Sequence, residues 1–136
     1  MKPTLLSGES IIRDGRGTYI KKLAKTGTWY ITNRRLCFYE IPAWKIGLFG
    51  MFSYLLSGTK QVLAINLDSI IFVRKEEKPL GSICRIRTSD TEFIATFNSE
   101  SSKWLKELMR AISLYTGNIV YGDENAFETT QEDQNI

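Results

Sequence analysis

The chain has 136 residues, of which 43% are hydrophobic and 24% are charged. This length and composition are typical of one folded domain, and they exclude collagen-like chains and chains too polar to build a core. The formal net charge is +3, and the absence of histidine removes the commonest general base and metal ligand in proteins.

The N-terminal residues offer Leu5 and Leu6 as their only apolar pair, which is too little for a signal peptide and favours a cytoplasmic protein. Residues 8–13 have the pattern of a short strand. Asp14-Gly15-Arg16-Gly17 then predicts a turn or a bulge. Extended character resumes over 18–23, and Lys25-Thr26-Gly27 predicts the next interruption.

A hairpin is predicted from two β-rich runs, 28–32 and 35–39, which Asn33-Arg34 separates. Asn tolerates the backbone of tight turns, so two residues suffice for the connection. Alternation along both runs places four large side chains toward a core: Trp29, Ile31, Leu36 and Phe38. Pro42 should end the second strand, because proline cannot donate to a strand ladder.

Further strands are predicted over 61–66, 70–74, 82–88 and 92–97. The turn signals between them are 78–81 and Ser89-Asp90, and the mixed charges of 75–78 indicate a solvated turn. In the third of these strands, alternation directs Cys84 and Ile86 inward and Arg85 and Arg87 to water. Cys37 and Cys84 have no metal-ligand spacing, which favours buried thiols in a reducing compartment; a disulfide between them stays an alternative.

An amphipathic helix is predicted over 100–116, where the pattern changes to helical spacing. Its apolar face has Trp104, Leu108, Ala111, Ile112 and Tyr115, and its other face has Lys103, Lys106, Glu107 and Arg110. Six or seven antiparallel strands followed by one helix predict a mainly β fold, a strongly bent sheet or partly open barrel that the helix closes. Residues 117–136 carry five acidic and no basic residues, so we expect a flexible acidic tail on a basic body.

The run from Gly27 to Tyr39 resembles the Gly-x-Leu-Tyr-Leu-Thr-x-x-Arg-Leu-x-Phe signature of GRAM and bacterial pleckstrin-homology-like (PH-like) domains. Trp29 and Ile31 stand at the leucine positions. Residues 65–70 and 86–90 resemble later family motifs, with Thr91 where the family has glycine. The resemblance implies a PH-like bent β-barrel over 1–116 with an apolar insertion loop, 41–60. Because such domains bind phosphoinositides, peptides or other proteins, it implies a binding role without choosing the ligand.

The segment 46–59 is the strongest anomaly, because it contains no charge between Lys45 and Lys60. It is too short to span a membrane, and its three glycines argue against a stable free helix. It could pack on its own barrel, form a homo-oligomer interface or insert shallowly into a membrane. The candidate apolar residues are Ile46, Leu48, Phe49, Met51, Phe52, Leu55 and Leu56.

Basic residues approach the same end of the predicted sheet, because alternate turns of an antiparallel meander emerge at one edge. The candidate anion-binding residues are Lys21, Lys22, Lys25, Lys45 and Lys60. Arg34 and Arg35 fall at the opposite end. The leading hypothesis is peripheral association with an anionic membrane surface or lipid head group, and the alternative is a scaffold or homo-oligomerisation module.

A solvated basic face is the plainer explanation of the same lysines. No catalytic residues, metal ligands or cofactor motifs are identified, so we expect binding rather than catalysis. Nucleic-acid binding is disfavoured, because the aromatic residues occupy core positions of the predicted strands and no recognition motif accompanies the lysines.

Overall fold

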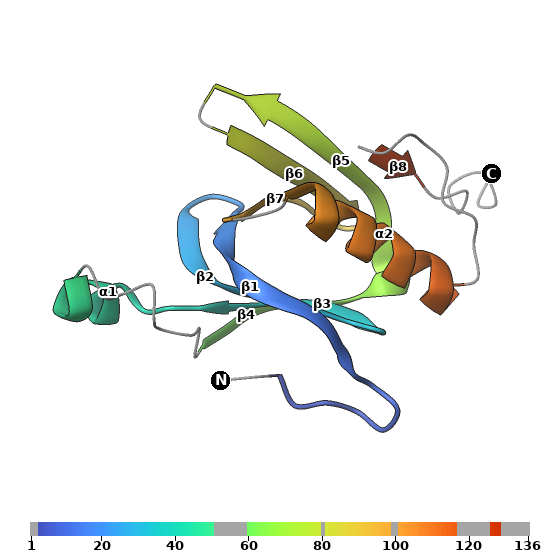
Figure 1. The fold of residues 1–136 in the computed structure, drawn as a ribbon, viewed down its shortest axis with the longest axis horizontal. Helices are drawn as coiled ribbons and strands as arrows, with labels where there is room; N and C mark the ends of the chain where they lie inside the picture. Colours follow the sequence, from blue (N-terminus) through green and yellow to red (C-terminus); the bar gives the residue numbers. More distant parts are fainter. Residues whose placement is uncertain (1–2, 51–59, 80, 99–100, 117–125, 129–136) are drawn as a thin grey trace.

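The computed structural model describes residues 3–50, 60–79, 81–98, 101–116 and 126–128. Its main feature is one antiparallel sheet with a long helix lying against it (Figure 1). In chain order the elements are β1 (Ile11–Ile20), β2 (Ala24–Thr32), β3 (Arg35–Glu40), α1 (Ala43–Phe49), β4 (Lys60–Asn66), the 3-10 helix η2 (Leu67–Ser69), β5 (Ile70–Lys78), β6 (Gly81–Thr88), β7 (Glu92–Phe97), α2 (Ser101–Thr116) and β8 (Ala126–Glu128).

The strand order is β4-β3-β2-β1-β7-β6-β5-β8, so the sheet is open and not closed into a barrel. The mainly β architecture with one long C-terminal helix is as predicted, but β4 and β5 stay apart. Figure 1 shows the half containing β2, β3 and β4 at a steep angle to the half containing β5, β6 and β7. Helix α2 packs on strands of both halves and covers the apolar interior between them.

The core is centred on aromatic side chains from both halves of the sheet. Trp29 and Phe38, from β2 and β3, have ring centroids 4.8 Å apart, and Phe93 from β7 stacks 6.3 Å from Trp29. Trp104 of α2 lies flat on Phe97, with 4.4 Å between ring centroids. The four core positions predicted for the hairpin, Trp29, Ile31, Leu36 and Phe38, are all fully buried.

The predicted turn or bulge at 14–17 is wrong, because β1 pairs with β2 in continuous register from Arg13 to Ile20; the register shift of β1 lies earlier, between Ile11 and Arg13. Its glycines serve close packing. A Cβ on Gly17 would overlap the Thr96 carbonyl oxygen and lie 2.7 Å from Trp29 Cδ1, and one on Gly15 would lie 2.9 Å from Trp104 Cζ2. Glycine is needed here so that neighbouring backbone and indole rings can approach β1.

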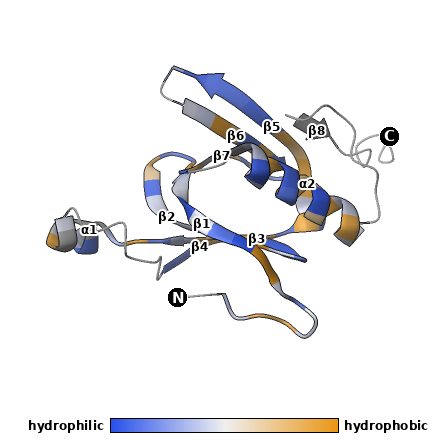
Figure 2. Cartoon of the chain, in the orientation of Figure 1, coloured by the Kyte–Doolittle hydropathy of each residue, from blue (hydrophilic) through white to orange (hydrophobic). Residues whose placement is uncertain are grey.

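The mixed-charge residues 75–78 belong to β5 and not to a turn. A Glu76 carboxylate oxygen lies 2.8 Å from Arg85 Nε on β6, and the other lies 3.4 Å from Lys78 Nζ. Ion pairs therefore stabilise the part of the β5–β6 hairpin that extends beyond the core. Figure 2 shows this change along β5, which is hydrophobic where it follows η2 and hydrophilic at its far end.

The N-terminal segment is tied to the β2–β3 hairpin by a buried ion pair. The Arg35 guanidinium donates from Nε and Nη2 to the two carboxylate oxygens of Glu9, at 2.9 and 2.8 Å. Thr32 Oγ1 donates to Glu9 at 2.6 Å, and Arg35 also donates to the Thr4 carbonyl oxygen. This cluster is not predicted by any local pattern, because Glu9 and Arg35 are far apart along the chain.

Both cysteines are buried and free, as the sequence favoured, so the alternative of a disulfide is not realised. Within the predicted insertion loop, residues 43–49 form α1, although the glycines argued against a helix. Residues 126–128 of the predicted flexible tail form β8 on the edge of β5. The remainder of the tail lies outside the described residues.

Candidate anion-binding site

The three N-terminal lysines of the prediction lie on and beside the β1–β2 turn, whose residues are 21–23. The interruption predicted at 25–27 is wrong, because these residues belong to β2 and pair with β1. Gly27 pairs with Gly17 on one side and with Glu40 on the other. A Cβ on Gly27 would overlap the Tyr39 carbonyl oxygen, so this glycine permits close strand approach and does not form a turn.

This turn borders a hollow of about 300 Å³, here called the lysine hollow. It is lined by Tyr19, Lys21, Lys22, Leu23, Lys25 and Val62. Tyr19 is buried and stacks on Phe38 with ring centroids 5.7 Å apart. Val62 comes from β4 and packs against the core. The hollow therefore has a floor fixed by core packing and a rim of lysines.

The positive charge of the rim comes mainly from Lys21 and Lys22. Both are exposed, and neither has an ion pair within the described part of the chain. Lys25 is partly neutralised, because its Nζ lies 3.5 Å from a Glu40 carboxylate oxygen. Burial raises the pKa of the Tyr19 phenol, so this group stays neutral at physiological pH. An anion at the rim would therefore meet two lysines without an ion pair in the described residues, Lys21 and Lys22, and a third, Lys25, that already pairs with Glu40.

Lys45 and Lys60 lie at the same end of the sheet, as the meander argument predicted, but they do not line the hollow. Lys60 is exposed at the start of β4 and pairs in register with Glu40. Lys45 is in α1, where its Nζ lies 5.5 Å from the centroid of the Trp44 ring. The structure thus brings Lys21, Lys22 and Lys25 together at one hollow and places Lys45 and Lys60 outside it.

Large apolar side chains are exposed at this same end. Leu48, one of the predicted apolar residues, is 72% exposed on α1, and Trp44 one turn earlier is 66% exposed. Leu23, at the tip of the β1–β2 turn, is 74% exposed. Figure 1 shows α1 extending away from the end of the sheet. The side chains of Ile46 and Phe49 and all of Met51, Phe52, Leu55 and Leu56 lie outside the described residues.

Sequence reasoning did not select Leu23 or Trp44. A signal was available for Leu23, since a leucine directly after two lysines, at a turn, has no strand neighbour to cover it. Trp44 lies inside the predicted loop 41–60 but before the uncharged stretch 46–59, so it was not among the candidate apolar residues.

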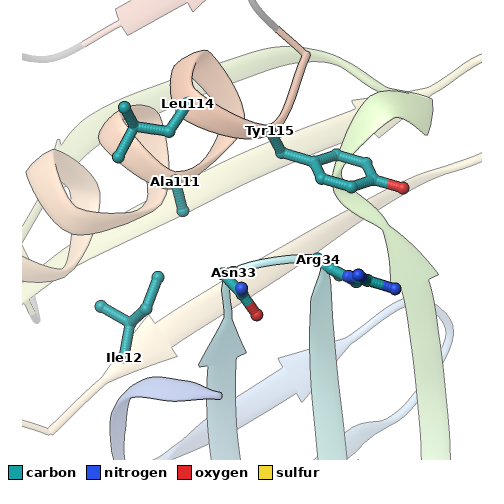
Figure 3. A pocket seen from close by; sticks show the side chains of 6 residues that line it. All are labelled: Ile12, Asn33, Arg34, Ala111, Leu114 and Tyr115. Atoms are coloured by element: carbon teal, nitrogen blue, oxygen red, sulfur yellow. The ribbon is translucent and has the colours of Figure 1, made fainter. Parts of the chain in front are cut away.

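A larger hollow, of about 680 Å³, lies beside the β2–β3 turn, at the other end of β2 from the lysine hollow, and Figure 3 shows the side chains that line it. It separates the last turns of α2 from the β2–β3 turn, and its lining is Ile12, Asn33, Arg34, Ala111, Leu114 and Tyr115. Only Arg34 supplies charge, and the Asn33 amide is already bonded to Gly8 and Ser10. Size therefore favours this hollow, but the convergence of charge favours the lysine hollow as an anion site.

No group of three or more metal-ligating acidic or cysteine side chains occurs among the described residues. None of the helices in the described ranges is long and apolar enough to cross a membrane.

Comparison with known proteins gives a likeness in fold alone. No family model matches the chain, and no curated protein matches it. The crystal structure of the C-terminal domain of an unknown protein from Leishmania infantum is similar, with a TM-score of 0.55 and 19% sequence identity. The similarity covers 78% of this chain and 86% of that one. The arrangement of strands and helix is therefore shared with a solved domain, and no function is transferred by it.

Proposed function

We propose that the chain is a non-catalytic binding module, PH-like and of the GRAM or bacterial PH kind, that associates peripherally with anionic membrane surfaces. The observation that carries the proposal is the lysine hollow, where Lys21, Lys22 and Lys25 surround one small cavity on a rigid floor. The resemblance of residues 27–39 to the GRAM signature supports the same assignment.

Charge provides the first part of the binding energy. A basic side chain near an anionic leaflet contributes about 1 kcal/mol, so the three rim lysines supply roughly 3 kcal/mol before the loss due to Glu40. Glu40 lowers the contribution of Lys25 to the binding free energy, because the lysine would have to leave the Glu40 carboxylate in order to contact a lipid phosphate. Lys21 and Lys22 are the residues on which head-group binding depends most.

Apolar contact provides the second part. Leu23 projects from the turn that carries Lys21 and Lys22, and it is mostly exposed. Burial of a leucine side chain is worth about 1.5–3 kcal/mol, comparable with the whole electrostatic contribution. Trp44 and Leu48 are four residues apart on α1 and therefore share one face, which adds a second apolar contact at the same end of the sheet.

Sedimentation with vesicles tests the proposal directly. The full chain should bind vesicles of phosphatidylserine and phosphatidylcholine at low salt and should bind phosphatidylcholine vesicles much more weakly. The variant Lys21→Glu/Lys22→Glu should lose at least tenfold in affinity, since each tenfold step corresponds to about 1.4 kcal/mol.

The matched control reverses two charges elsewhere. Lys106 and Arg110 are exposed on the outer face of α2, away from the β1–β2 turn. The variant Lys106→Glu/Arg110→Glu has the same net charge as the test variant and should keep nearly normal binding. Equal losses in the two variants would show that only net charge matters, and the lysine hollow would then have no special role.

A homo-oligomerisation module is the second candidate, favoured by the exposed pair Trp44 and Leu48 on α1. In this function, the same face would be buried between subunits and not in lipid. Light scattering distinguishes the two: an oligomer that dissociates on Trp44→Ser, without vesicles present, supports oligomerisation, whereas a monomer at high protein concentration removes it.

A further inference from the structure

The outer edge of β5 holds an extended segment of the chain's own tail. Residues 126–128 pair antiparallel with it, so that Ala126 is opposite Arg74 and Glu128 is opposite Phe72. Within the described residues this pairing covers three positions of β5, and the strand continues to Lys78. The described strand β8 is therefore shorter than β5, and a strand edge is a template for a further strand.

The fold does not depend on this tail strand for its core. The core cluster consists of residues between Tyr19 and Ile112, all before the tail begins. Figure 1 shows β8 at the margin of the sheet, next to β5. Loss of β8 would expose one strand edge while the packing of both sheet halves and α2 remained, so the tail strand is exchangeable at small cost.

The chemistry of the edge selects an acidic occupant. Phe72 and Arg74 face the same side of the sheet as Arg87 and Arg85, their partners in register on β6. The Arg87 guanidinium lies 4.9 Å from the Phe72 ring centroid, and Arg85 is bonded to Glu76. Arg74 is exposed and has no ion pair within the described ranges. The segment that pairs here contains one acidic residue, Glu128, and the sequence of 117–136 has five acidic residues and no basic one.

We propose that the β5 edge is a binding site for an extended acidic segment of a partner protein, which adds to the sheet as an antiparallel strand. The tail strand β8 occupies this site within the free chain. A partner segment that pairs along Phe72–Lys78 makes more backbone hydrogen bonds than β8 does and displaces it. This site lies on a different strand from the lysine hollow, and its test is independent of membrane binding.

A full-chain variant that cannot form β8 provides the first test. Adjacent residues of a strand direct their N–H groups to opposite edges, so Phe127→Pro/Glu128→Pro removes one donor that faces β5 whichever residue supplies it. The probe is a synthetic peptide with the sequence of residues 120–131, measured by fluorescence anisotropy. The variant should bind the peptide at least tenfold more tightly than the wild-type chain, because its site is vacated.

Location and charge are tested with the same probe. Hydrogen exchange at the amides of 72–74 should accelerate in the proline variant and slow again when the peptide is added. In the proline background, Arg74→Glu should lower the affinity for the peptide at least fivefold. Lys60→Glu, on the opposite edge strand β4, should leave the affinity for the peptide within twofold of that of the proline variant. Equal affinity of the peptide for wild-type and proline variant, or no slowing at 72–74, overturns the proposal.

Discussion

Glu9 and Arg35 form a two-pronged ion pair between a Glu9 side chain that is fully buried and an Arg35 side chain that is 18% exposed. The same carboxylate also accepts from the Leu6 amide and the Thr32 hydroxyl. Every acceptor position of Glu9 is therefore engaged, and the segment before β1 is fixed to the end of the β2–β3 hairpin.

Removal of one partner of this pair should be more damaging than removal of both. Arg35→Met leaves the Glu9 carboxylate buried without its cation, which costs about 3–5 kcal/mol. The double variant Glu9→Gln/Arg35→Met should recover part of that loss, because no buried charge remains. Urea unfolding of the four chains in the cycle measures the coupling, and strict additivity of the two single changes would contradict a close pair.

The pH dependence of stability should carry the signature of Glu9. Its hydrogen bond with Arg35 lowers the pKa of Glu9 from 4.5 to about 2, despite the opposing effect of burial. A lowered pKa stabilises the fold fully above about pH 4.5, and this contribution is lost as the pH falls toward 2. The loss amounts to about 3 kcal/mol. Glu9→Gln is the control: its unfolding free energy should fall less over that interval.

A methyl group on Gly17 should be far more harmful than one on Gly47. The Gly17 side of β1 meets the Thr96 carbonyl oxygen and the Trp29 indole, neither of which has space to withdraw. Gly17→Ala should therefore cost about 3 kcal/mol or more. Gly47→Ala meets no described atom within 4 Å and should change the unfolding free energy by less than about 1 kcal/mol. Thermal unfolding of both variants decides the comparison.

The two contributions to vesicle binding should separate by salt. Leu23→Ser removes an apolar contact, so its effect on phosphatidylserine vesicle binding should be similar at low and high salt. Lys21→Glu/Lys22→Glu should matter most at low salt, because ions screen charges on a surface. Leu114→Ser is the control for Leu23, since Leu114 is equally exposed on α2, outside the lysine hollow. A Leu23→Ser chain that binds normally would exclude insertion of this turn.

Both cysteines should be inert in the native chain. Burial raises the pKa of the Cys84 thiol to about 12 and also raises that of Cys37, so the reactive thiolate is scarce at neutral pH. A thiol reagent such as DTNB should label neither residue in native buffer and both in denaturant. Rapid native labelling would mean that the strands carrying them open readily.

Much of the fold followed from local pattern. The hairpin of β2 and β3 was predictable, since two β-rich runs flank the two-residue turn Asn33-Arg34. Helix α2 was predictable from its spacing. The Gly15 and Gly17 positions were misread because their requirement comes from Trp104 and Trp29, which are distant in sequence. The Glu9–Arg35 pair was also missed, because its partners are distant in sequence. That β4 and β5 do not pair depends on strand curvature, which local pattern does not show.

The candidate site was predictable in part. Because alternate turns of an antiparallel meander emerge at one edge, the basic residues were expected at one end of the sheet. In the structure Lys21, Lys22 and Lys25 line one hollow. The alternation of turns between the two ends of a sheet does not show which side chains line one cavity. For this reason Lys45 and Lys60 were grouped with Lys21, Lys22 and Lys25. Leu23 was missed although its position, directly after two lysines and at a turn, was a signal for an exposed apolar side chain.

The pairing of β1 with β7 also has a consequence for how the molecule is made. Gly17 to Ile20 pair with Ile94 to Phe97, and this contact joins the two halves of the sheet. Within each half most neighbouring strands are joined by short turns, so hairpins such as β1–β2 and β5–β6 can associate early, whereas the β3–β4 connection is longer. The seam closes a far longer loop, so it should form late in folding. During synthesis, the first strand must wait with one edge unsatisfied until the seventh has left the ribosome.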